Sequence, residues 1–166
     1  MSSDGSKSHA QRRLLLIGAL ALGACGFTPV YGPGGSGDKL QNALQFSAPE
    51  TEFGFRVRTT LEDRFGLTGT PLYTVEIGLN SKRTTAAIDV DGDTTRFDIS
   101  GTAAWVLSTL DGSTVTRGEV QTSTSYSATG TTVATQTAER DSRARLAQAL
   151  ADLIATDLIF ASGKLP

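Results

Sequence analysis

Residues 97–107, FDISGTAAWVL, decide the fold, because apolar or small residues occupy every second position and the polar residues Asp98, Ser100 and Thr102 lie between them. A period of two predicts a β-strand with one buried face. Trp105 falls in the middle of the apolar set, and we expect it in the core rather than in a ligand cage. The predicted buried face consists of Phe97, Ile99, Gly101, Ala103, Trp105 and Leu107.

Two Asp-Gly pairs flank this strand, at residues 91–92 and 111–112, and Asp-Gly is a hairpin signal. They predict antiparallel neighbours on both sides. Upstream, residues 73–80 alternate with the same period, and residues 84–90 lead into the first turn. Downstream, residues 115–129 are rich in Thr, Val and Tyr but have few large apolar groups, so we expect an exposed strand at the sheet edge.

Two segments have helical periodicity. Within residues 51–65 the residues Val57, Leu61 and Phe65 recur every four positions, with Thr51 placed as the N-cap and Gly66 just past the end. Residues 133–161 are the second helix, and their apolar face consists of Leu146, Ala149, Leu150, Leu153, Ile154 and Leu158.

A short strand around Leu44 and Phe46 completes the pattern, although residues 42–44 could also form a helical turn. The predicted order is β-α-β-β-β-α, an α+β fold with two amphipathic helices packed on one face of a four-stranded mixed β-sheet. The helix between the first two strands allows them to be parallel through a right-handed crossover.

The N-terminal region has the features of an export signal. After Arg12 and Arg13, an apolar run extends only to about Ala24, half the length needed to span a membrane. Residues 22–25, LGAC, resemble the lipobox of bacterial lipoproteins, which implies cleavage before Cys25, diacylation of its sulfur and acylation of the new amine. Gly26 follows, which by the same resemblance implies the outer membrane. The alternative is a plain signal peptide whose Cys25 stays free or pairs with another chain.

We therefore divide the chain into three parts. Residues 1–24 are a signal peptide that is removed, residues 25–38 are the acylated cysteine and a Gly- and Pro-rich linker, and residues 39–166 form a single domain.

Composition excludes several functional classes. Removing Lys7, Arg12, Arg13 and Asp4 with the signal reduces the 15 basic and 17 acidic residues of the chain to 12 and 16, which argues against nucleic acid as a partner. The remaining chain has no His and no free Cys, so we expect neither a metal nor another cofactor. Residues 89–93, DVDGD, lack the spacing of a calcium-binding EF-hand and are interpreted as a polar hairpin tip.

Residues 25–32, CGFTPVYG, resemble the start of the mature chain in the LptE family of lipopolysaccharide (LPS) assembly lipoproteins. The element order, the hairpin at residues 90–94 and the segment AERD at 138–141 extend the resemblance. It implies that the protein is not an enzyme, that it lies as a plug inside an LptD-like outer-membrane β-barrel, and that it helps assemble this barrel and move LPS to the outer leaflet. It also implies a location on the periplasmic face of the outer membrane, held by the lipid anchor.

The resemblance also suggests where LPS could bind. In some members of the family a basic residue in the hairpin before the long strand is implicated in LPS contact. Here the tip, Val90 and Asp91, is not basic, so the nearest basic residues, Lys82, Arg83 and Arg96, are the candidates. The alternative reading of Lys82 and Arg83 is a pair that protects a strand edge.

Three further alternatives stay open. Arg140, Arg143 and Arg145 could bind phosphates, or they could form a solvated helix face with Glu139 and Asp141 as local partners. For the whole protein, the rival function is a generic periplasmic lipid-anchored domain that binds a small ligand or a glycan. A lipid-anchored hydrolase is the least favoured, because His and free Cys are absent from the mature chain.

Overall fold

The computed structural model describes residues 38–165, so the predicted signal peptide, Cys25 and most of the linker lie outside the described residues. The chain forms, in order, η1 (Asp38–Leu40), β1 (Leu44–Ser47), α2 (Glu52–Phe65), β2 (Tyr73–Ile88), β3 (Thr94–Thr109), β4 (Thr114–Ser127), α3 (Thr132–Ala161) and η2 (Ser162–Lys164). The predicted order β-α-β-β-β-α is confirmed.

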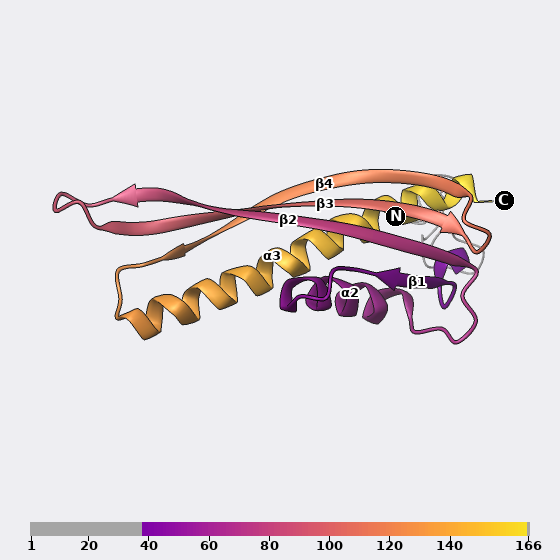
Figure 1. The fold of residues 1–166 in the computed structure, drawn as a ribbon, viewed down its shortest axis with the longest axis horizontal. Coiled ribbons are helices and arrows are strands. Elements are labelled where there is room, and N and C mark those ends of the chain that lie inside the picture. The colour runs from indigo at the N-terminus through magenta and orange to yellow at the C-terminus, as the bar shows by residue number, and fades with distance from the viewer. Residues whose placement is uncertain (1–37, 166) are drawn as a thin grey trace, which may run out of the picture.

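The four strands form one mixed sheet in the order β1-β2-β3-β4 (Figure 1). β1 pairs with β2 in parallel, whereas β2–β3 and β3–β4 are antiparallel. The predicted turns close both hairpins, and Gly92 and Gly112 adopt positive φ angles of 89° and 88°. β4 lies at the sheet edge, as its composition predicts.

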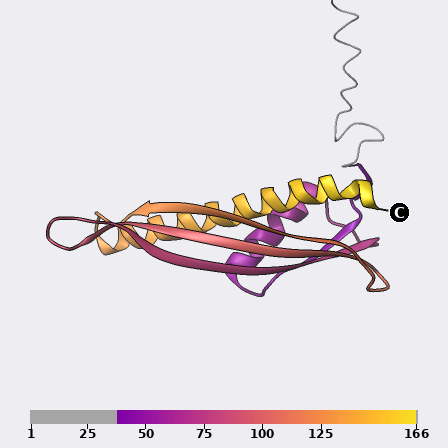
Figure 2. The same cartoon turned by 90° about the horizontal axis from the view of Figure 1, so that it is seen from above.

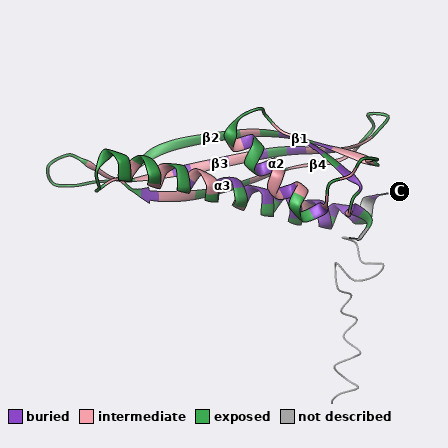
Figure 3. Cartoon of the chain, turned by 90° about the horizontal axis from the view of Figure 1, so that it is seen from below, coloured by how far each residue is buried: buried purple, intermediate pink, exposed green. Residues whose placement is uncertain are grey.

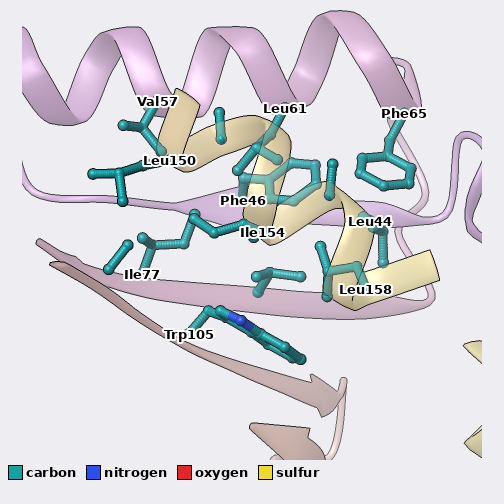
Figure 4. Close-up of a cluster of buried hydrophobic side chains, with 14 of the residues drawn as sticks. Leu44, Phe46, Val57, Leu61, Phe65, Ile77, Trp105, Leu150, Ile154 and Leu158 are labelled. Carbon is teal, nitrogen blue, oxygen red and sulfur yellow. The ribbon is translucent and has the colours of Figure 1, made fainter. Parts of the chain in front are cut away.

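Both helices cover the same face of this sheet, with α3 running along its length and α2 beside β1 (Figure 2). The core lies between the layers, where Trp105 is 3% exposed and Leu150 and Ile154 are fully buried (Figure 4). The other face has no covering element within residues 38–165, and its side chains range from exposed to half-buried (Figure 3). The α+β class with two helices on one sheet face is thereby confirmed.

Side-chain caps define the helix ends. Thr51 is the N-cap of α2, and its Oγ1 accepts a hydrogen bond from the Gly54 amide at 3.0 Å. Gly66 ends α2 with φ of 84°, a conformation that favours glycine. Thr131 caps α3 in the same way through the Ala134 amide at 3.3 Å.

β2 continues past Asn80, where the alternating sequence ends, and pairs with a β3 of equal length. Each has 16 residues, about 50 Å of strand. The hairpin that they form extends beyond the N-terminal end of α3 (Figure 1), and its tip carries the exposed apolar side chains of Ile88 and Val90. No helix within residues 38–165 is long and apolar enough to cross a membrane.

Candidate functional site

The long hairpin places the three predicted basic residues on two different faces of the sheet. Lys82 and Arg83 are consecutive in β2 and therefore point to opposite faces. Arg83 is paired with Ile99, whose side chain is fully buried beneath the helices. Lys82 is paired with Ser100, on the uncovered face.

Arg96 shares the uncovered face with Lys82. It lies four residues before Ser100 on β3, which places it about 14 Å further along the sheet toward the hairpin tip. The structure thus brings Lys82 and Arg96 onto one surface and places Arg83 elsewhere. None of the three positions is tested for LPS contact, which stays a prediction.

Arg83 joins a set of side chains that connects the hairpin to α3, here named the Arg83 clamp. The guanidinium lies over the Phe97 ring at 4.8 Å from its centroid, and this ring stacks on Tyr126 at 5.4 Å. Nη1 of Arg83 donates to the Tyr126 hydroxyl at 3.3 Å and to Oε2 of Glu139 at 3.2 Å. The clamp consists of Arg83, Phe97, Tyr126, Glu139 and Arg143.

Glu139 is the acceptor at the centre of the clamp. Its Oε2 also accepts from the Tyr126 hydroxyl at 3.2 Å, and its Oε1 accepts from Arg143 Nη2 at 2.9 Å and Nε at 3.1 Å. Hydrogen bonding to Arg143, aided by Tyr126 and by the charge of Arg83, lowers the pKa of the Glu139 carboxyl. The Tyr126 hydrogen bond and the charge of Glu139 raise the pKa of Arg83. The guanidinium of Arg83 is therefore held within the domain by Tyr126 and by the Glu139 carboxylate that it shares with Arg143.

The uncovered face offers a different environment. Around Lys82 its side chains are mostly hydroxyls and amides. The Lys82 ammonium has no hydrogen bond or ion pair with residues 38–165, whereas Arg96 donates to Ser125 Oγ at 2.6 Å and lies 3.9 Å from an Asp98 carboxylate oxygen. This distal half of the face consists of Asn80, Lys82, Thr84, Arg96, Asp98, Ser100, Thr102, Gln121, Ser123, Ser125 and Ser127.

Of the three predicted arginines of α3, only Arg143 has a side-chain partner, whereas the side chains of Arg140 and Arg145 make no hydrogen bond or ion pair with residues 38–165. Arg143 is paired with Glu139, as the i,i+4 spacing predicts, and with Arg140 and Arg56 it lines a cleft of about 230 Å³ beside the start of α2. Arg56 is itself paired with Glu52 at 3.1 Å. No group of three or more His, Cys, Asp or Glu in the part of the chain that the structure describes is placed to hold a metal ion.

The sequence does not connect Arg83 with Tyr126 or with Glu139, and it indicates Glu139 only as a local partner of the arginines of α3. Tyr126 and Glu139 lie 43 and 56 residues from Arg83, too far apart for local spacing to connect them. One sequence feature does point to the clamp: Tyr126 is an aromatic residue in a strand that otherwise has few large apolar groups.

The fold recurs in solved structures. A protein described as a lipoprotein from Caulobacter crescentus CB15 is 23% identical, with a TM-score of 0.65 over 78% of this chain and 97% of that chain. Rare lipoprotein B from Shewanella oneidensis is 13% identical, with a TM-score of 0.59 over 75% and 98%. Lipoprotein B from Nitrosomonas europaea is 12% identical, with a TM-score of 0.57 over 75% and 87%. At these low identities, the TM-scores show a shared fold and nothing further.

The family follows from the sequence match. No curated protein sequence matches the chain. The family model for LptE, described as lipopolysaccharide-assembly, matches residues 39–158, which include every strand and nearly all of α3. With well over half of its 166 residues covered by this match, the chain belongs to the LptE lipopolysaccharide-assembly family.

Proposed function

We propose that this protein is an outer-membrane lipoprotein, anchored through Cys25, that lies inside an LptD-like β-barrel and assists LPS insertion into the outer leaflet. Membership of the LptE family supports the role in LPS assembly. The descriptions of the structural neighbours as lipoproteins support the lipid anchor. The role is one of assembly and binding rather than of catalysis.

The observation that carries the proposal is the uncovered face of the sheet. Its distal half presents rows of Ser, Thr, Asn and Gln side chains along β2, β3 and β4, among which the charged residues are Lys82, Arg96 and Asp98. The lumen of an outer-membrane barrel is polar, and such side chains can hydrogen-bond to it without burying an unpaired charge. A plug needs a surface of this composition.

The same face suggests how LPS is contacted. LPS carries phosphate and carboxylate groups, which lysine and arginine bind through charge-assisted hydrogen bonds. Lys82 has no ionic partner within the described residues. Arg96 donates to the neutral Ser125 hydroxyl, and its ion pair with Asp98 is long, at 3.9 Å, and exposed. The guanidinium of Arg83 is already engaged in the clamp, by Glu139, Tyr126 and the Phe97 ring. We therefore propose Lys82 and Arg96, ahead of Arg83, as the LPS contacts.

Photocrosslinking in living Gram-negative cells tests the barrel. A photoreactive amino acid at Ser123, which is exposed on the uncovered face, should give an adduct with a barrel protein of several hundred residues. The same probe in cells that lack the barrel protein is the control. If this position gives no barrel adduct and depletion of the protein leaves surface LPS normal, the proposal is wrong.

A separate comparison tests the LPS contacts. Lys82→Ala and Arg96→Ala should each reduce crosslinking of LPS to the uncovered face. Arg117→Ala is the matched control, because Arg117 is exposed on the same face but lies ten residues along β4 from the partner of Arg96, about 33 Å away. Equal effects of all three substitutions would contradict a localised contact.

A further inference from the structure

Large apolar side chains are exposed at the end of the domain where the described chain begins. Leu67 is 78% exposed, Leu72 and Leu110 are 61% exposed, and Phe160 is 80% exposed. Each lies just outside, or in the last turn of, a different element. Side chains of this kind gathered at one end indicate a contact that these residues make with something outside the domain.

Strand pairing and chain direction bring these residues together. Tyr73 pairs with Thr109, so Leu72 and Leu110 occupy the next positions on neighbouring strands. Leu67 follows the C-terminal end of α2, and Phe160 lies in the last turn of α3; both helices run toward this same end (Figures 1 and 2). We name these four residues, Leu67, Leu72, Leu110 and Phe160, the apolar end.

The chain enters the domain beside the apolar end. The carbonyl of Ala43, five residues after Asp38, accepts hydrogen bonds from the amides of Leu72 and Tyr73 at 2.8 and 3.1 Å. Asp38 therefore lies close to this end of the sheet, and the hairpin tip lies at the other end (Figure 1).

The segment from Cys25 to Asp38, here called the tether, is short enough to restrict which end of the domain can contact the membrane. Thirteen residue steps separate Cys25 from Asp38, and fully extended they span about 45 Å. From Leu72 to Ile88 the strand extends about 53 Å. With Cys25 in the bilayer, the domain cannot stand upright on its hairpin tip, because the tether is too short to reach back to Asp38.

The local charges suit the interface between headgroups and acyl chains. Residues 66–72, GLTGTPL, contain no charged side chain. Asp111, next to Leu110, accepts hydrogen bonds from the Thr109 hydroxyl and the Ser113 amide, which lower the pKa of its carboxyl. A charged turn of this kind suits headgroup depth, while the adjacent Leu110 and Leu72 on the neighbouring strand are placed to reach acyl chains.

We propose that the apolar end contacts the lipid surface directly, as a second point of membrane attachment beside the acylated cysteine. This inference rests on the lipid anchor in the proposed function. It orients the domain: α3 and the sheet extend away from the inner leaflet, and the hairpin tip is the part furthest from it.

Fluorescence from single labelled positions in a bilayer tests this orientation. The full acylated chain is placed in phosphatidylethanolamine and phosphatidylglycerol nanodiscs, with the environment-sensitive dye NBD attached to Leu110→Cys. Ile88→Cys is the matched control, because both positions are 61% exposed and they lie at opposite ends of the sheet. Cys25 is the only native cysteine, so acylation leaves the introduced thiol as the single labelling site.

We expect the dye at position 110 to emit at shorter wavelength and to be quenched by lipids with brominated acyl chains, and the dye at position 88 to show neither effect. Equal emission and quenching at the two positions would overturn the contact. So would a blue shift at position 110 that appears only when the barrel protein is added, because the barrel would then be the partner. The intact mass separates the two proposals: an unacylated chain refutes the anchor, whereas an acylated chain without quenching refutes only the lipid contact.

Discussion

The indole of Trp105 lies across Gly118 on the neighbouring edge strand. A Cβ added at Gly118 would be 2.7 Å from Cζ2 and 2.8 Å from Cε2 of the ring. The two residues are direct partners in the β3–β4 register, and Trp105 is only 3% exposed. Gly118 therefore provides the space in which the ring lies, and the buried Nε1 of Trp105 has no hydrogen-bond partner within the described residues.

Gly118→Ala should destabilise the domain because the rigid ring must move. Forcing extra volume into a packed site costs about 1–3 kcal/mol. Urea unfolding followed by the emission of Trp105, the single tryptophan of the chain, measures the loss. Gly69→Ala is the control, since a Cβ there would have no atom within 4 Å. Equal unfolding midpoints for the two variants would contradict the contact.

Gly54→Ala should also destabilise the protein, although alanine favours helices by about 1 kcal/mol over glycine. A Cβ at position 54 would be 2.1 Å from the carbonyl oxygen of Pro49, a backbone atom that cannot rotate away. We expect a net loss of about 2 kcal/mol, because the steric term exceeds the gain in propensity. Thermal unfolding followed by circular dichroism measures it, and a raised Tm would refute the packing of α2 against Pro49.

Local rules predict much of this fold from sequence. Thr51 and Gly66 bound α2 as their capping preferences indicate, and both Asp-Gly turns close hairpins. Gly54 shows what local rules do not predict. By its helix propensity alone, a glycine at this position only weakens α2, whereas in the structure the missing Cβ leaves room for the Pro49 carbonyl, five residues earlier in the chain. Only the tertiary arrangement shows this.

The placement of the basic residues in β2 is harder to predict from sequence than the fold, because it also depends on tertiary pairing. The alternating pattern of β2 ends at Asn80, because the residues that follow include no large apolar side chain before Ile88. β2 nevertheless continues, since backbone pairing with β3 persists to Thr85 and, past a bulge, to Ile88. Once the strand is known to reach residues 82 and 83, their opposite orientation follows from the period of two.

Cys25→Ser should abolish acylation and leave the precursor uncut, because both steps of lipoprotein maturation require the thiol. Labelling with radioactive palmitate and the apparent mass of the product in cell fractions measure the two effects. Arg117→Ala is a suitable control, since Arg117 is exposed, lies outside the apolar end and is far from the cleavage site in sequence. A Cys25→Ser protein that remains in the outer-membrane fraction would refute the anchor.

Glu139→Gln should remove part of the pH dependence of stability. The pKa of Glu139 in the folded protein is below its ordinary value of 4.5, because Arg143, Tyr126 and Arg83 stabilise the carboxylate. Between the folded and unfolded pKa values the unfolded chain binds more protons. The stabilisation is therefore fully present above about pH 4.5 and is lost as the pH falls through the folded pKa.

At neutral pH the substitution should cost about 1 kcal/mol, since the clamp is partly exposed to solvent. The difference from the native protein should shrink in acid, where native Glu139 is itself protonated. Glu119→Gln is the control, because the side chain of Glu119 is exposed and makes no hydrogen bond or ion pair within the described residues. Urea unfolding at a series of pH values measures both variants. A difference between Glu139→Gln and the native protein that stays constant down to about pH 3 would show that the clamp does not depend on the charge of this carboxylate.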